Sequence, residues 1–352
     1  MNAIAIYAGD TAVFWNGIVI CLGIASGFLL SYALYTAHSG KGGSMWAMFT
    51  ISIVLGVLLS RLVHSWCHRE QYSGMISALT DYSSGSYFLP GAVLGLIVSA
   101  TIVSFFGFHA KPGELLDAAA PGAALSIALI RLSHFFTTAC RSKIVVSNPK
   151  LRRIPLFVSA QSTSGGTEYR FATFFASFTL MLLAAVFLVV FYYYSHRTKM
   201  KDSCSENGHV WRIFMLIYCS TELVLDSTRN DSTFLYFKIL SVLNKYSNFV
   251  SLTQLIAAIA ILSVFLYYSR CAAVYDGRDK KRLFIWAGFL FGLAGTGISE
   301  YLVQRYSNRY VLFYSTQSAA VLIMAIFTFI MYRRCTLRED EEEPSFLPET
   351  KN

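Results

Sequence analysis

Long apolar runs separated by short polar segments make up most of the chain. Each run is near the ~20 residues that a helix needs to cross the hydrocarbon core of a bilayer. The runs lack the two-residue alternation of barrel strands, so we predict an all-α, polytopic bundle of transmembrane helices. The nine predicted spans are Thr11–Tyr35, Ser44–Ser65, Tyr87–Phe106, Glu114–Phe136, Phe171–Tyr194, Val210–Asp226, Phe249–Tyr268, Leu283–Val303 and Tyr310–Tyr332.

The composition agrees with a membrane protein. The 352 residues are 55% hydrophobic and 14% charged, whereas a soluble domain has about 25% charged residues. The first run is too long for the apolar region of a cleaved signal peptide and has no basic segment before it, so we interpret it as a retained helix. The net charge of +9 suits contact with anionic lipid head groups rather than with nucleic acid.

The distribution of basic residues predicts the orientation of the spans. Basic segments follow the fifth, seventh and ninth spans, with the residues Arg197, Lys199, Lys201, Arg278, Lys280, Lys281, Arg282, Arg333 and Arg334. The positive-inside rule places these segments in the cytoplasm, so the N-terminus lies outside and the C-terminus inside. Segment 137–170 is also basic yet falls outside in this arrangement, and its length weakens the rule there.

The second and fourth spans end with the same short pattern. Arg61 is followed by His64, and Arg131 by His134, so that in each pair the side chains share one face of the helix end. A charged group within a membrane is costly and therefore marks a functional site by default. Each pair also has a simpler interpretation, in which the arginine anchors its helix at the lipid head groups.

The sixth span ends with charges of both signs. Glu222, Asp226 and Arg229 are spaced i, i+4 and i+7, which places them on one helix face. The two acids can pair with arginines of neighbouring spans, or one of them can act as a base. Because even-numbered spans run in the same direction, we predict that the ends of spans two, four and six reach the same membrane face.

Asp117 stands apart from this cluster. It lies fourteen residues before Arg131, which is about 21 Å along a helix, and so belongs to the opposite membrane face. We interpret it as an acid near the N-terminus of its own helix, where the helix dipole favours negative charge. Pro121 then occupies an early position in that helix.

The sequence gives no sign of a metal site or an organic cofactor. Its seven cysteines are scattered without a Cys-x-x-Cys pair, and it has no Walker motif. The glycines of segment 292–297 lie inside an apolar run and indicate close helix packing. Segment 336–352 is acidic and contains two prolines, so we expect it to be disordered.

Several short motifs occur in a recognisable order along the chain. They are Trp15-Asn16-Gly17, Arg61, Pro90 to Gly95, Leu116-Asp117-Ala118, Arg131 to Phe135, and Glu222 to Asp231. In this order the sequence resembles the bacterial prolipoprotein diacylglyceryl transferase family. The resemblance covers seven spans. It implies a family-like domain at 1–270 with an extracytoplasmic cap loop at 137–170, an additional transmembrane hairpin at 271–335, and the acidic tail at 336–352.

The resemblance also implies a reaction in the bacterial plasma membrane. Such enzymes move the diacylglyceryl group of phosphatidylglycerol to the cysteine thiol of a lipobox-containing preprolipoprotein, and glycerol phosphate is released. Guanidinium groups bind phosphate in a bidentate way, which makes the candidate lipid-binding residues Arg61, Arg131 and Arg229. The candidate catalytic residues are His134, Glu222 and Asp226.

The sequence departs from the family pattern at several positions. Asn16 takes the place of a tyrosine, Pro90 of a histidine and Glu222 of an arginine. The signature around Arg131 keeps Phe135 but is changed at Ile130, Ser133, His134, Thr137 and Ala139. Two alternatives therefore stay open, namely a relative that binds anionic phospholipid without transfer and one that acts on another acceptor. A transporter is less favoured, since the charges gather at span ends and not in broken helices at the midplane.

Overall fold

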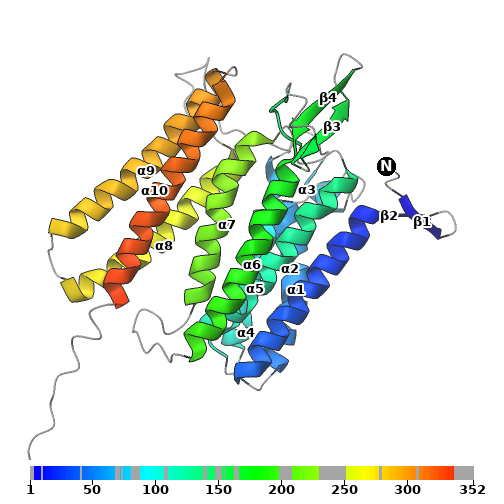
Figure 1. Cartoon of the computed structure of the whole chain (residues 1–352). Helices are drawn as coiled ribbons and strands as arrows, with labels where there is room; N and C mark the ends of the chain where they lie inside the picture. The colour runs from blue at the N-terminus through cyan, green and yellow to red at the C-terminus, as the bar shows by residue number, and fades with distance from the viewer. Residues whose placement is uncertain are drawn as a thin grey trace, which may run out of the picture.

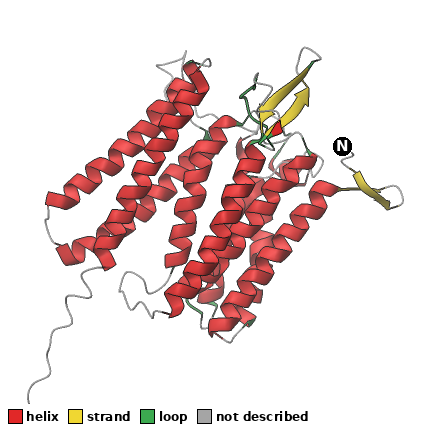
Figure 2. Ribbon diagram, in the orientation of Figure 1, coloured by secondary structure: helices red, strands yellow, loops and turns green. Residues whose placement is uncertain are grey.

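The computed structural model describes residues 4–8, 11–39, 42–67, 72, 74–80, 88–106, 110–137, 141–146, 153–154, 156–161, 166–197, 208–229, 251–276, 280–306 and 309–336. Helices dominate these residues and lie side by side in a bundle (Figures 1 and 2). The predicted acidic tail falls almost wholly outside the described residues.

A helix is present at each of the nine predicted spans, so the prediction of a polytopic helical bundle is confirmed. The helices are α1 (Trp15–Ser39), α2 (Gly43–Cys67), α3 (Met75–Thr80), α4 (Leu89–Phe105), α5 (Pro112–Ser133), α6 (Thr173–Arg197), α7 (His209–Thr228), α8 (Leu252–Asp276), α9 (Lys280–Arg305) and α10 (Tyr310–Thr336). The short α3 lies between predicted spans, and a 3-10 turn, η3 (His134–Phe136), follows α5.

Two β-hairpins accompany the helices. The strands β1 (Ile4–Ala8) and β2 (Thr11–Phe14) pair in the antiparallel sense, as do β3 (Phe157–Gln161) and β4 (Thr167–Phe171). The predicted start of the first span at Thr11 was therefore wrong. Threonine, valine and phenylalanine favour extended backbone, and β2 gains a partner strand, so the helix begins at Trp15.

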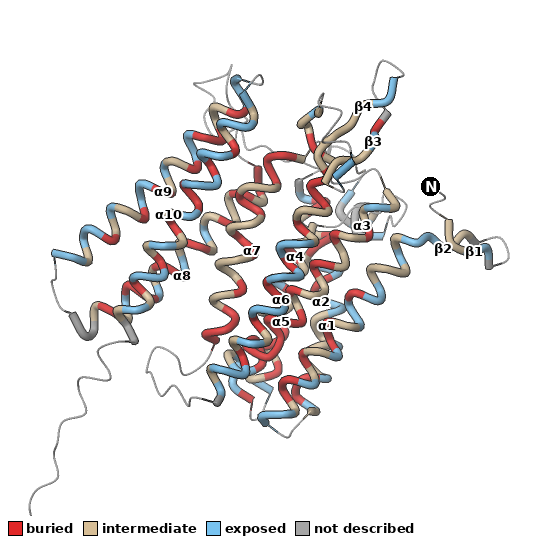
Figure 3. Tube along the Cα trace, viewed as in Figure 1, coloured by how far each residue is buried: buried red, intermediate tan, exposed pale blue. Residues whose placement is uncertain are grey.

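Seven helices among the described residues are long and apolar enough to cross a membrane, namely α1, α2, α5, α6, α8, α9 and α10. α4 is apolar but has 17 residues. α7 is not among the seven, since it carries several polar side chains. Eleven of its 20 residues are buried, and Figure 3 shows it as one of the most enclosed helices. Because α7 contacts protein rather than lipid over much of its surface, its polar residues can be satisfied inside the bundle.

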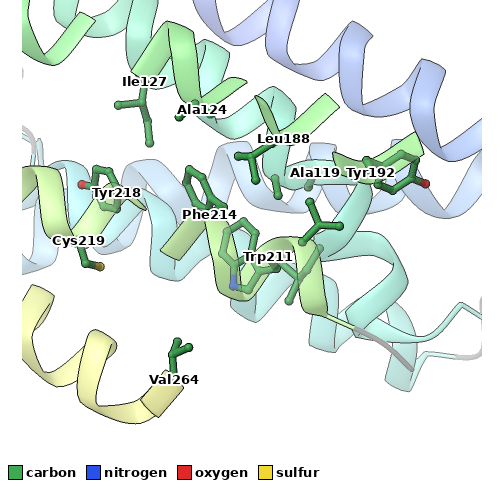
Figure 4. Packing of buried hydrophobic residues seen from close by; sticks show 14 of the residues in the cluster. Ala119, Ala124, Ile127, Leu188, Tyr192, Trp211, Phe214, Tyr218, Cys219 and Val264 are labelled. Atoms are coloured by element: carbon green, nitrogen blue, oxygen red, sulfur yellow. The ribbon is translucent and has the colours of Figure 1, made fainter. Parts of the chain in front are cut away.

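α7 lies between α5 and α6 on one side and α8 and α10 on the other (Figure 1). α5 and α7 run parallel, because Asp117 contacts the start of α7 and Arg131 contacts its end. α8 runs antiparallel to α7, since Ser251, just before α8, contacts Asp226 near the end of α7. The apolar core fills the space between these helices (Figure 4). Its labelled residues are Ala119, Ala124, Ile127, Leu188, Tyr192, Trp211, Phe214, Tyr218, Cys219 and Val264.

Small residues allow α1 to approach α5 closely. The two helices are antiparallel, with Gly23 beside Leu129 and Gly27 beside Gly122. A Cβ atom built on Gly122 would lie 2.1 Å from the Gly27 carbonyl oxygen, so a side chain at this position would force the helices apart. This is the small-residue packing that drives helix association where no hydrophobic effect operates between helices.

The direction of α2 follows from its contact with α1. Trp46, near the start of α2, packs edge-on against Tyr32 in the second half of α1, with ring centroids 5.9 Å apart. α2 is therefore antiparallel to α1 and parallel to α5 and α7. The ends of the second, fourth and sixth spans thus lie at one face of the bundle, as the sequence predicted.

The interpretation of the 292–297 glycines holds in part. A Cβ atom on Gly292 would lie 2.7 Å from Cγ of Met324, so this glycine does allow α9 to pack against α10. Gly297, in contrast, has no atom within 4 Å of the same position. Close packing therefore accounts for Gly292 and not for the whole glycine-rich segment.

Asp117 stabilises a different helix from the one expected. Its Oδ2 accepts hydrogen bonds from the backbone N–H groups of Gly208 and His209, and Oδ1 accepts one from Trp211. The interpretation of Asp117 as an acid for its own helix was wrong, because the unsatisfied N–H groups at the start of α7 bind it instead. Pro121 is likewise inside α5 and not at an early position.

Asp117→Ala is expected to lower the free energy of unfolding, because three backbone donors at the buried start of α7 lose their acceptor. An unsatisfied buried group costs about 1–3 kcal/mol. The matched control is Glu114→Ala, which removes an exposed carboxylate from the same helix and should change stability by less than ~0.5 kcal/mol. Thermal unfolding in detergent measures both, and equal midpoints for the two variants would contradict the capping role.

Candidate functional site

The end of α7 brings together charged residues that are far apart in the sequence. Nη2 of Arg131, in the last turn of α5, lies 2.5 Å from Oε1 of Glu222 in α7. Arg131 is 6% exposed and Glu222 is 3% exposed, so neither charge faces lipid or solvent. Of the two open interpretations of Glu222, pairing with an arginine of a neighbouring span is therefore present in the structure.

Burial makes this ion pair energetically demanding. Removing two charges from water costs several kcal/mol per ion, and the attraction between them offsets this only when the geometry is good. Each partner consequently depends on the other. A guanidinium or a carboxylate left alone inside the bundle would be strongly destabilising.

Asp226 lies one turn further along α7 and has a different environment. Its Oδ1 lies 3.1 Å from Nη1 of Arg229, and its Oδ2 accepts a hydrogen bond from Oγ of Ser251 at 2.7 Å. Asp226 thus pairs with an arginine of its own segment and not of a neighbouring span. The charges of Glu222 and Arg131 also act on Asp226, so the two ion pairs form one electrostatic cluster.

The segment after α5 closes over the end of α7. Oγ of Ser142 and the backbone N–H of Lys143 each donate to the Thr228 carbonyl oxygen at 2.8 Å. The hydroxyl groups of Thr173 and Thr228 are also 2.8 Å apart. These contacts satisfy backbone groups that a helix C-terminus leaves open. Ser142 also forms an isolated β-bridge with Arg229, so this part of segment 137–170 lies beside Arg229.

Arg61 and His64 are buried at the end of α2, on the same face of the bundle. The guanidinium carbon of Arg61 lies 5.4 Å from the ring centroid of Tyr72. Contact of Arg61 with the cluster at the end of α7 stays a prediction. His134 lies in η3, partly buried, directly after the helix that carries Arg131.

An open, mostly apolar groove of about 640 Å³ lies near this face. It runs between the start of α1 and the residues that follow α5. Its lining includes Phe14, Asn16, Cys21, Phe136 and Thr137. Among the described residues, no three His, Cys, Asp or Glu side chains gather as a metal site would require.

Comparison with known proteins identifies the family. The family model for prolipoprotein diacylglyceryl transferase matches residues 3–265. The chain belongs to the prolipoprotein diacylglyceryl transferase family. Its membership confirms the resemblance found in the sequence motifs, and the family name indicates a transferase.

Two relatives of the family carry the name phosphatidylglycerol–prolipoprotein diacylglyceryl transferase. One, from Clostridium botulinum (strain Langeland), is 25% identical over 272 residues, which are 76% of this chain and 97% of the relative. Another, from Lactococcus lactis subsp. lactis (strain IL1403), is 27% identical over 241 residues, which are 67% of this chain and 85% of the relative.

The family match contains the whole charged cluster but ends inside α8. α9 and α10 lie beyond it, yet together with α8 they contribute residues near the end of α7 that the sequence did not single out. These residues are Gln254 of α8, Glu300 of α9 and Gln317 of α10, all buried. Glu300 was detectable in principle, because it is an acid within an apolar run.

The buried pair predicts a specific pattern of stabilities. Glu222→Leu alone leaves Arg131 without its counter-ion and should lower the free energy of unfolding by about 3–5 kcal/mol, whereas Arg131→Met/Glu222→Leu should recover most of that loss. Denaturation of the three proteins in the same detergent measures the effect. A double variant less stable than Glu222→Leu would contradict the coupling of these two residues.

Proposed function

We propose that this chain is a phosphatidylglycerol–prolipoprotein diacylglyceryl transferase, which moves diacylglyceryl from phosphatidylglycerol to a lipobox cysteine thiol. The observation that carries the proposal is the family match over residues 3–265, since every candidate residue from Arg61 to Arg229 lies within it. The relatives named above, which act on these substrates by name, support the same conclusion.

The reaction joins sulfur to carbon and separates carbon from oxygen. The cysteine thiol loses its proton to a base, and the sulfur attacks the glyceryl carbon that carries the phosphate ester. The carbon–oxygen bond breaks, and glycerol phosphate leaves with the electron pair. The site must therefore accept one proton, stabilise a phosphate and admit a lipid from the bilayer.

The cluster at the end of α7 has groups suited to these tasks. Arg229 is partly exposed and Arg131 is buried in the same cluster, so guanidinium groups can receive the phosphate in a site largely shielded from water. When phosphate takes the place of a carboxylate at an arginine, that carboxylate loses its counter-ion and becomes available for the thiol proton. Glu222 and Asp226 are the candidates for this exchange, and His134 is a third candidate base.

The membrane arrangement is part of the proposal. The positive-inside rule supports an N-terminus outside the plasma membrane and a C-terminus in the cytoplasm, which places the ends of α5 and α7 at the outer face. Residues 1–270 then form the transferase domain, 137–170 its cap loop, and 271–335 an additional hairpin. The groove beside α1 offers an apolar path from the bilayer to this face.

The alternative of a relative that binds anionic phospholipid without transfer gains no support from the comparisons, because the matching relatives are named as transferases. It remains an outcome that the experiment below can reveal, as does transfer to a different acceptor.

Transfer is expected to depend on the charges of the buried pair. Purified protein in vesicles is mixed with labelled phosphatidylglycerol and a lipobox peptide, and the label on the peptide cysteine is measured. Arg131→Met/Glu222→Leu, which keeps its fold, should lose at least ~10²-fold in rate. The control Arg305→Ala removes an exposed arginine from the end of α9 and should transfer at the wild-type rate.

Full transfer by the double variant would contradict the proposed site. Absence of transfer by the wild-type protein, together with lipid binding that the double variant loses, would instead establish the non-catalytic alternative.

A further inference from the structure

A group of buried polar side chains joins the end of α7 to α8, α9 and α10. Gln254, Glu300 and Gln317 are 4%, 4% and 0% exposed, and each belongs to a helix long and apolar enough to cross a membrane. A polar group buried without a partner costs several kcal/mol in such surroundings. Three buried polar side chains at one level of the bundle must therefore be arranged so that each has hydrogen-bond partners.

The two glutamine amides form a double bridge between α9 and α7. The Nε2 atoms of Gln254 and Gln317 each lie 3.0 Å from Oε2 of Glu300 and 3.2 Å from the Leu223 carbonyl oxygen. Each amide nitrogen has two hydrogens, so each can donate one to the carboxylate and one to the carbonyl. The second carboxylate oxygen of Glu300 accepts a hydrogen bond from Gln304 at 2.8 Å.

The same network extends to the candidate site. Oε1 of Gln254 accepts the backbone N–H of Ser251, whose hydroxyl group donates to Asp226. On the other side, Oε1 of Gln317 lies 3.5 Å from the hydroxyl oxygen of Ser227, which donates to the Val224 carbonyl oxygen at 3.1 Å. The Ser227 carbonyl oxygen in turn accepts a hydrogen bond from Tyr314 at 3.1 Å. The network thus holds α7 at residues directly adjacent to Glu222 and Asp226.

The location of Glu300 and Gln317 distinguishes this network from ordinary packing. Both lie beyond residue 265, where the family match ends. Elsewhere α9 and α10 contact each other through small residues, as at Gly292, and through the uncharged hydroxyl groups of Ser299 and Thr316. A hairpin that only enlarged the bundle would need no carboxylate at this depth. A buried carboxylate in a membrane helix is costly and therefore marks a functional site by default.

We propose that the α9–α10 hairpin is part of the site, and that Glu300 and Gln317 are positioning residues for the last two turns of α7. They hold the back of α7 at Leu223 and Ser227, so that Glu222 meets Arg131 on the opposite side and Asp226 meets Arg229. The consequence for catalysis rests on the proposed function, whereas the effect on α7 does not.

The test compares two variants of the hairpin. Glu300→Leu removes both carboxylate oxygens with little change in volume, so neither glutamine amide keeps its acceptor on α9 and the double bridge is broken. The control is Thr328→Val, because Thr328 is also fully buried in α10 but donates only within its own helix, to Met324. Hydrogen–deuterium exchange in residues 222–229, thermal midpoint and transfer rate are measured for both.

The proposal predicts faster exchange in residues 222–229 for Glu300→Leu than for Thr328→Val, and a transfer rate roughly tenfold lower. The conservative variant Glu300→Gln keeps one oxygen that can accept hydrogen bonds from both glutamine amides, so it should transfer at close to the wild-type rate and show that the acceptor rather than the charge is needed.

Equal exchange at the end of α7 in Glu300→Leu and Thr328→Val would overturn the proposal. So would a transfer rate that falls only in proportion to the thermal midpoint in both variants. If the wild-type protein shows no transfer, the proposed function fails, and the exchange measurement alone decides whether the hairpin positions α7.

Discussion

The buried ion pair between Arg131 and Glu222 is the interaction on which the arrangement of the bundle depends. It requires α5 and α7 to be parallel and in one register, and Asp117 fixes the same register at the other end. The two contacts lie fourteen residues apart on both helices, from Asp117 to Arg131 and from Gly208 to Glu222. A slip of one turn would leave charges at both ends unpaired, each at a cost of several kcal/mol.

This constraint explains why α7, which carries buried charges near its end, lies inside the bundle. Glu222 of α7 faces α5, whereas the backbone carbonyl groups of Leu223 and Ser227 face α8 and α10. Helix association in a membrane relies on close packing and on hydrogen bonds between helices. In this bundle different helices use each of these two interactions. α1 and α5 approach through glycines, whereas α7 is held by ions and amides at its ends.

The positions of the spans and the charged helix ends were predictable because both follow from local patterns. The length of an apolar run predicts a span, and the spacing of Glu222 and Asp226 places both near the end of one helix. The predicted place of Arg229 on the same helix face was wrong, because α7 ends at Thr228 and Arg229 has extended backbone. The partners across space were not predictable, since periodicity does not say which neighbour a face meets. Asp117 was assigned to the wrong helix for this reason, and the bridge from Glu300 to Leu223 was missed. The hairpin β1–β2 did have a local signal, because Gly9-Asp10 separates two short runs of strand-forming residues.

The central claim is that the lipid head group binds at the end of α7 that meets Arg131. The most direct test uses phosphatidylglycerol with a photoreactive group on its head group, irradiated in vesicles with the wild-type protein, followed by mapping of the labelled peptides. The account predicts labelling in residues 131–137 and 222–229, at the face where these two segments lie. Labelling confined to the opposite face, around Asp117 and the start of α7, would contradict it.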